Sequence, residues 1–172
     1  MQDLKVGIQI AELKYAIKNK TYVTARSLQA TGDLNYEAAA HLQASGDAED
    51  DYELKRAINN TIDEVKVELG EYLSAETTST DNLIDSKVED NDEVTITFSL
   101  PENFNSAAAD ALGSGIHDFI VGRSIYAWYR LTFPKLAEAC NADAVAALDR
   151  AKKSLYKRSR PQRPSYTEGT EG

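Results

Sequence analysis

The sequence contains few of the residues from which catalytic and metal sites are built. Its 172 residues include one cysteine, Cys140, and two histidines, His41 and His117, which stand far apart and belong to no HxxxH pair. A single cysteine excludes an internal disulfide framework, and isolated histidines do not make a zinc-binding motif. The sequence also has no Gly-x-Ser-x-Gly motif and no complete phosphate-binding loop. We therefore expect no enzymatic activity, no cofactor and no metal.

Long hydrophobic runs are also missing. No apolar stretch approaches the roughly 18 residues that span a bilayer. The N-terminus carries an acidic residue at position 3 and has no small-residue cleavage site. We expect no membrane segment and no secretory signal. The length suits one domain with a hydrophobic core and is too short for two.

Positive charge is scarce over most of the chain. The net charge is −9, and from Thr31 to Glu93 eighteen Asp and Glu stand against four Lys and Arg. From Leu148 to Gly172 the balance reverses, with seven Lys and Arg against three acids. Because affinity for nucleic acid comes from cations on phosphates, the acidic body argues against direct wrapping of DNA or RNA.

Hydrophobic spacing predicts a mainly α protein. Apolar residues recur at helical intervals over 3–18, 50–73, about 105–130 and 134 to about 158. The short turn before Pro134 predicts that the last two helices form an antiparallel hairpin. Residues 20–50 receive no firm assignment: "TYVTARSLQATGD" fits a strand or a loop, and "LNYEAAAHLQASGD" fits a short helix closed by Gly46.

The hydrophobic period changes to two in "EVTITFSL", Glu93 to Leu100, which predicts a strand. Upstream, "DNLIDSKV" is a plausible partner strand and "EDND" a tight connection, giving a β-hairpin over about 82–100. A lone hairpin is marginal in water, so it must pack on helices or on another subunit. The predicted fold is a helical bundle, residues 1–156, with an inserted β-hairpin and an extended basic C-terminal arm, residues 157–172.

Three glycines, Gly113, Gly115 and Gly122, interrupt the predicted helix over 105–130. Each costs about 1 kcal/mol relative to alanine in a helix interior, so we expect close backbone approach to another helix or subunit. Elsewhere, "DAEDD" (47–51) has enough carboxylates for calcium but lacks the alternating ligand pattern. A solvated helix start is the better interpretation.

Two clusters are candidates for partner binding. The first is "YAWYRLTF", with four aromatic residues in eight: Tyr126, Trp128, Tyr129 and Phe133. Their side chains either anchor the core of the helical hairpin or meet a neighbouring subunit, since Trp, Tyr and Arg dominate interface energetics. Both interpretations stay open, and the four residues are our candidate subunit interface.

The second cluster is the basic tail, with the candidate partner-binding residues Lys157, Arg158, Arg160, Pro161, Arg163 and Pro164. One interpretation is that these cations complement the dipole of the preceding helix and the chain then frays. The other is an arm that docks on an acidic surface, because two prolines three apart favour an extended conformation and lower the entropy lost on docking. We favour the arm.

The order of these pieces resembles a known family. The segments "GDAEDDYELKRAINNTIDEVKVELGEYL", "VEDNDEVTITFSLP", "HDFIVGRSIYAWYRLT" and "ADAVAALDRAKKSLYKRSRPQRP" resemble the head–tail connector (neck adaptor) proteins of tailed bacteriophages, especially phages of Bacteroidetes. The resemblance covers roughly residues 47–164, and the region before it is longer than expected for that family.

The resemblance implies a helical-bundle subunit of a homo-oligomeric ring, commonly a dodecamer, in the virion neck. Such a ring is assembled in the host cytoplasm, binds the portal and adjacent tail or neck proteins, and lets DNA pass without specific binding. The segment from Tyr156 to Pro164 would then contact the portal or a neighbouring subunit. A function of another class also fits the composition: a monomeric acidic helical regulator whose negative face mimics nucleic acid and binds a host protein.

Overall fold

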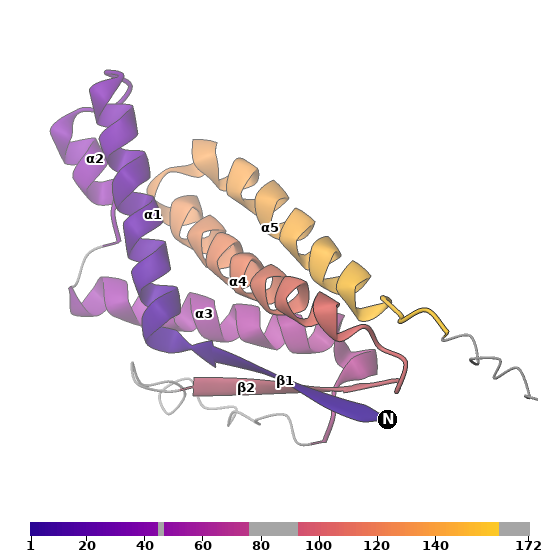
Figure 1. Ribbon diagram of the computed structural model, residues 1–172. Helices are drawn as coiled ribbons and strands as arrows, with labels where there is room; N and C mark the ends of the chain where they lie inside the picture. Colours follow the sequence, from indigo (N-terminus) through magenta and orange to yellow (C-terminus); the bar gives the residue numbers. More distant parts are fainter. Residues whose placement is uncertain (45–46, 76–92, 162–172) are drawn as a thin grey trace, which may run out of the picture.

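The computed structural model describes residues 1–44, 47–75 and 93–161. Over these residues the protein is mainly α, with five α-helices and a two-stranded antiparallel sheet (Figure 1). The elements in chain order are β1 (Gln2–Gln9), α1 (Ile10–Ala30), α2 (Tyr36–Leu42), α3 (Ala48–Glu68), the 3-10 turn η1 (Gly70–Tyr72), β2 (Glu93–Leu100), the 3-10 turn η3 (Ser106–Ala108), α4 (Ala109–Thr132) and α5 (Pro134–Leu155). The predicted fold class, a helical bundle with a small antiparallel sheet, is confirmed.

The sheet joins two distant parts of the chain. β2 is the strand predicted from "EVTITFSL", and its partner is β1, in the register that pairs Gln2 with Leu100 and Gln9 with Glu93. The segment expected to pair with β2, residues 81–88, lies outside the described residues. On the other edge of β2, Leu73 forms an isolated bridge with Phe98. The sheet lies beneath α3 and α4, so the helices supply the cover that a two-stranded sheet needs (Figure 1).

The prediction of a helix from Asp3 was wrong for its first turns. Leu4, Val6 and Ile8 alternate with exposed residues, as a strand requires, and Ile8 is buried against the helices. Residues four apart, such as Val6 and Ile10, fall on one face of a helix and also on one face of a strand. Their spacing alone therefore does not distinguish the two structures. The helix begins only at Ile10 and continues to Ala30, through residues that received no assignment from the sequence.

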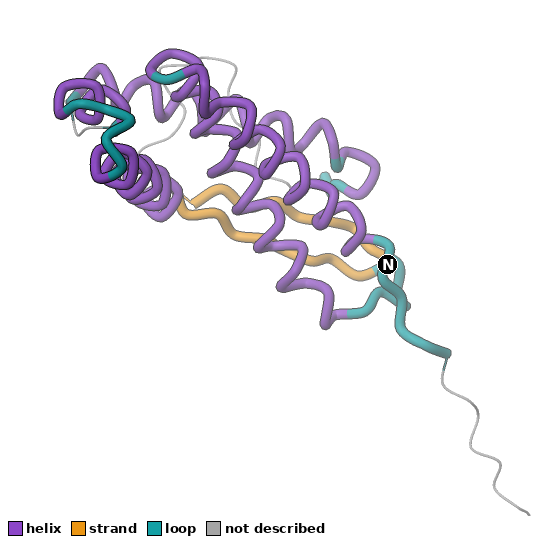
Figure 2. The backbone as a smooth tube through the Cα atoms, turned by 90° about the horizontal axis from the view of Figure 1, so that it is seen from above, coloured by secondary structure: helices purple, strands orange, loops and turns teal. Residues whose placement is uncertain are grey.

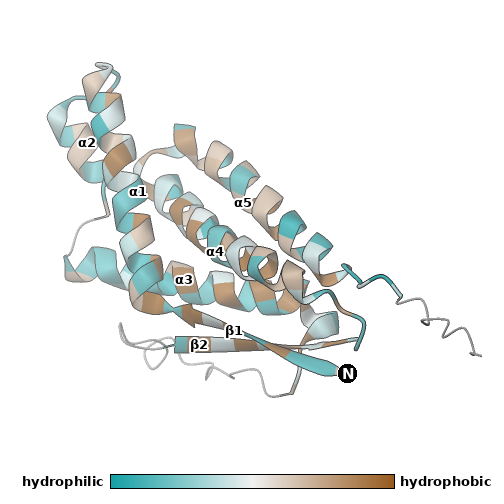
Figure 3. Ribbon diagram, in the orientation of Figure 1, coloured by the Kyte–Doolittle hydropathy of each residue, from teal (hydrophilic) through white to brown (hydrophobic). Residues whose placement is uncertain are grey.

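The longer helices follow the predicted periodicity. On α3 the buried positions are those expected from the sequence, and they are Leu54, Ile58, Thr61, Ile62 and Val65. The short helix α2 lies inside "LNYEAAAHLQASGD", and Asn35 caps it, since its Oδ1 accepts a hydrogen bond from the amide of Ala38 at 2.8 Å. The buried apolar residues come from both strands and all five helices and form one core; Figure 3 colours each residue of the ribbon by its hydropathy. Within the described ranges no helix combines the length and hydropathy of a membrane span.

The hairpin of α4 and α5 is confirmed. The two helices run side by side in both views, joined at Phe133, and Pro134 occupies the first turn of α5 (Figures 1 and 2). Two of the three glycines allow this close packing. A Cβ on Gly115 would lie 3.0 Å from the carbonyl oxygen of Ala147, and one on Gly122 would lie 3.1 Å from the Cβ of Ala144.

Gly113 provides a matched control for the role of these glycines, because a Cβ there would meet nothing within 4 Å. We expect Gly113→Ala to raise the free energy of unfolding by about 0.5–1 kcal/mol through helix propensity. Gly115→Ala should lower it by about 1–3 kcal/mol, because the added methyl group overfills the contact with α5. Urea denaturation of both variants checks the opposite signs, and equal effects would contradict the close-packing explanation.

Candidate interaction surfaces

The structure divides the aromatic cluster at the end of α4. Trp128 is 7% exposed and Tyr129 is 2% exposed. The indole Nε1 of Trp128 donates a hydrogen bond to the carbonyl oxygen of Leu42, at the end of α2, at 2.9 Å. Burial raises the pKa of the Tyr129 hydroxyl. The core interpretation therefore holds for these two residues, whose side chains leave little surface exposed to another subunit.

Tyr126 and Phe133 remain partly exposed. The ring of Tyr126 lies 4.9 Å from the guanidinium of Arg123 and 5.6 Å from that of Arg130, distances at which cations interact with an aromatic ring. Arg123 also donates hydrogen bonds to Glu64 at 3.0 Å and to Asn141 at 2.7 Å, linking α4 to α3 and α5. Of the four predicted interface residues, only these two are accessible to a partner.

The first residues of the predicted arm, which begins at Lys157, are held on the body of the protein. The amide of Asn105 donates to the carbonyl of Lys157 at 3.1 Å, and the amide of Ser159 donates to the carbonyl of Asn103 at 2.8 Å. These bonds surround an antiparallel bridge between Phe104 and Arg158. Residues 157–159 are therefore fixed on the bundle, and they form the root of the predicted arm.

Arg158 was expected to bind a partner, but its guanidinium serves the end of α5. Its Nη1 donates to the carbonyl oxygen of Leu155 at 2.7 Å, one of the carbonyls that a helix C-terminus leaves without a helical partner. Lys157, Arg160 and Pro161 are exposed, as a binding arm requires. The remaining predicted arm residues, Arg163 and Pro164, lie outside the described part of the chain.

A pair of tyrosines supports the arm root. The rings of Tyr72 and Tyr156 meet edge to face, with centroids 5.8 Å apart. A hydrogen bond with Tyr156, together with partial burial, raises the pKa of Tyr72 to about 12. The contact joins the end of α5 to η1, which follows α3. The root of the arm is therefore anchored to the C-terminal end of α3 as well as to residues 103–105.

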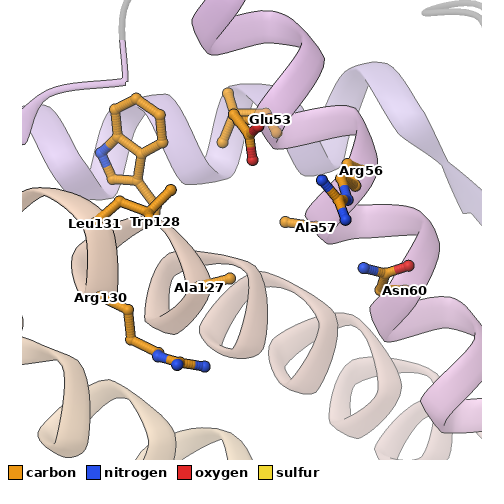
Figure 4. A pocket seen from close by; sticks show the side chains of 9 residues that line it. Glu53, Arg56, Ala57, Asn60, Ala127, Trp128, Arg130 and Leu131 are labelled. Carbon is orange, nitrogen blue, oxygen red and sulfur yellow. The ribbon is translucent and has the colours of Figure 1, made fainter.

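A trough runs between α3 and α4, and its first half is basic. This half encloses about 390 Å³ and is lined by Glu53, Leu54, Arg56, Ala57, Asn60, Ala127, Trp128, Arg130 and Leu131. In Figure 4, Arg56 and Asn60 project from α3, whereas Arg130 extends from α4. Among the described residues neither arginine has a carboxylate partner. Leu131 is 69% exposed, so the rim of this basic half is apolar.

The second half of the trough is acidic. It encloses about 430 Å³ and is lined by Asn60, Asp63, Glu64, Val67, Glu68 and Arg123. Asn60 belongs to both halves, so the two are continuous along α3. Glu64 pairs with Arg123, and Glu68 pairs with Lys152 at 2.6 Å, whereas Asp63 is exposed and has no cationic partner within the described ranges. Val67 is 80% exposed between these acids.

A second groove lies between α1, α4 and α5. It encloses about 710 Å³, and Val23, Ile125, Tyr129 and Cys140 contribute to its apolar lining. Burial is the main cause that raises the pKa of the Cys140 thiol, which disfavours the reactive thiolate. The histidines do not enter this groove. In the described ranges no three His, Cys, Asp or Glu side chains gather as a metal-binding group.

The acidic segment "DAEDD" opens α3, as predicted, but it is not wholly solvated. Asp51 forms an ion pair with Lys14 of α1, whose side chain is almost completely buried, and a second one with Lys55 at 3.5 Å. Asp47 is the N-cap residue of α3. Its backbone is extended, and its carbonyl oxygen accepts a hydrogen bond from the amide of Asp51. The segment thus joins α1 to α3 through a charge pair.

Comparison with known proteins gives no assignment: no protein family, no curated protein and no solved structure matches the chain. The interaction surfaces must therefore be interpreted from their own geometry.

The trough between α3 and α4 was not predicted from the sequence. Arg56, Asn60 and Asp63 recur at intervals of three and four and so share one face of α3. That pattern signals an exposed face only. The packing of α4 beside it, which brings Arg130 to the same groove, cannot be read from local spacing.

Proposed function

We propose that this protein is a structural subunit of a tailed-phage neck, a head–tail connector that assembles as a homo-oligomeric ring between the portal and the tail. The observation that carries the proposal is the fixed root of the C-terminal arm. Backbone hydrogen bonds to Asn103 and Asn105 hold residues 157–159, beyond which Arg160 and Pro161 stand exposed. The resemblance of segments within residues 47–164 to connector proteins supports it.

The arm and the body carry opposite charges. The whole chain has a net charge of −9, whereas the arm, residues 157–172, holds four Lys and Arg against two acids. A cationic arm that leaves one subunit at a fixed point is suited to an acidic surface on the next subunit. Contacts between two different surfaces of identical subunits close into rings when the rotation between copies permits it. The acidic bodies of such a ring would repel DNA phosphates and let the duplex slide.

The mass of the assembled protein tests this proposal. We expect native mass spectrometry and negative-stain electron microscopy of the full chain to show closed rings of one size, alone or on the portal encoded in the same genome. Changing Lys157, Arg160 and Arg163 together to glutamine should lower the fraction of rings at a given protein concentration. Strong salt dependence of that fraction is also expected, because the contacts are between exposed charges.

Three cations away from the arm serve as a control with the same change in net charge. Lys20, Lys135 and Lys153 are exposed on α1 and α5, and their joint change to glutamine should leave ring formation intact. A wild-type chain that stays monomeric at every concentration, with and without the portal, would contradict the ring. A monomer that instead captured a basic host protein would favour the acidic regulator.

A further inference from the structure

The two halves of the trough between α3 and α4 have opposite charge. Its acidic half contains three carboxylates and one guanidinium, and its basic half contains two guanidiniums and one carboxylate. Asp63 in the acidic half, and Arg56 and Arg130 in the basic half, lack partners of opposite charge among the described residues. A protein with a net charge of −9 thus has two arginines in one groove that contact no carboxylate in the part of the chain that the structure describes. Such a groove suits a ligand whose charge changes sign along its length.

The C-terminal segment of this chain has that pattern. Its cations end at Arg163, and its acids are Glu168 and Glu171. The twelve positions from Arg56 to Glu68 span about 18 Å of helix at 1.5 Å per residue. In an extended proline-rich chain, at about 3.1 Å per residue, Glu168 lies about 16 Å from Arg163 and about 25 Å from Arg160. The spacing between Arg163 and Glu168 therefore matches the length of the trough, and Arg160 extends about one helical turn beyond its acidic end.

We propose that the trough of one copy receives the C-terminal arm of the next copy, running antiparallel to α3. Arg163 would lie in the acidic half, close to Glu68 and Asp63, with Arg160 at the outer end of that half, and Glu168 would lie beside Arg56. The exposed side chain of Val67 offers an apolar surface for the proline rings of the arm. This inference rests on the proposed ring, because it names the surface through which neighbouring subunits are joined.

The root of the arm favours a second copy as the source. Residues 157–159 are held on Asn103 and Asn105, and the described chain then extends beyond the end of α5, away from the helices (Figures 1 and 2). To occupy its own trough, an arm would have to reverse direction at once. An arm that continues outward reaches a neighbouring subunit. A contact between an arm and a trough is heterologous, as a ring requires.

Cross-linking between two copies tests the location of the arm. Both chains carry Cys140→Ser; one has Val67→Cys in the trough and the other has Ser165→Cys in the arm, with different tags. We expect a disulfide between the two chains after mild oxidation. Val145→Cys on α5 is the matched control, since Val145 is a 55% exposed helical valine outside the trough. Its cross-link with the arm should be several-fold weaker.

Charge exchange tests the direction of the arm. Arg56→Glu on the trough copy should reduce the cross-link several-fold, and Glu168→Arg on the arm copy should restore it. Asp63→Lys should reduce it as well, whereas Glu49→Lys, an equal change at an exposed site near the start of α3, should not. Equal yields at Val67 and Val145 overturn the trough as the acceptor. A cross-link that forms only within a chain carrying both cysteines overturns the second copy as the source.

The same samples separate this inference from the proposed function. If Arg56→Glu and Asp63→Lys leave the yield of rings at the wild-type value, the trough is not the contact between subunits, whereas the proposed ring is retained. If the copies cross-link but never form a closed ring, the contact between arm and trough is supported and the connector ring is contradicted.

Discussion

Replacing Trp128 by alanine is expected to lower the free energy of unfolding by about 3–5 kcal/mol, the cost of removing a large buried aromatic side chain. The indole lies in the core between α4 and α2, and its Nε1 hydrogen bonds to the carbonyl of Leu42. Both the packing and the partner of that carbonyl are lost in the variant. Urea denaturation followed by far-ultraviolet circular dichroism measures the change, because Trp128 is the sole tryptophan and its fluorescence disappears with it.

Trp128→Phe separates packing from hydrogen bonding. The phenyl ring retains much of the buried area but cannot donate to the carbonyl of Leu42. We expect a loss of about 1–3 kcal/mol for leaving that carbonyl unpaired. An alanine variant as stable as wild type would contradict the core position of Trp128 and return it to the set of candidate interface residues.

Asp51→Ala should have the second large effect, a loss of about 3 kcal/mol or more, because it leaves a buried ammonium group without its carboxylate. Lys14 is 6% exposed on α1, and Asp51 reaches it from the first turns of α3. Glu49→Ala, which removes an exposed acid two residues away, is expected to change stability by less than about 0.5 kcal/mol. Chemical denaturation of the two variants gives the comparison.

A double variant distinguishes the charge pair from other roles of Asp51. Lys14→Met replaces the buried ammonium with an apolar side chain of similar length. Combined with Asp51→Ala, it should recover most of the lost stability, since apolar replacement of a buried ion pair is often neutral. If the double variant is as unstable as Asp51→Ala alone, then loss of the ion pair with the buried Lys14 is not the cause.

The sequence predicts the helices well because their signal is local. On α3, and along the hairpin of α4 and α5, apolar residues at helical spacing identify the buried face, and Pro134 marks the turn. The partner of β2 could not be predicted in this way. β1 lies more than eighty residues earlier, and the hydrophobic positions before Ile10 fit two periods. Only tertiary packing decides between them.

The candidate surfaces depend still more on tertiary structure. Periodicity cannot distinguish a tryptophan in the core from one at an interface. The role of Trp128 is decided by its burial and by its hydrogen bond to the carbonyl oxygen of Leu42. The root of the arm is held by backbone groups, and a pairing between Asn105 and Lys157 leaves no trace in side-chain pattern. The basic composition of the tail predicts an arm but not the point at which the chain leaves the body.

The pairing of β1 with β2 also affects how the chain is made. A ribosome that adds about 5–20 residues per second needs roughly 4–17 s to make the 84 residues between Gln9 and its partner Glu93. During that interval the residues of β1 have been made but lack the strand with which they pair. Asp3 and Lys5, which are exposed in the finished sheet, place charges on this segment, and such charges disfavour pairing with other chains.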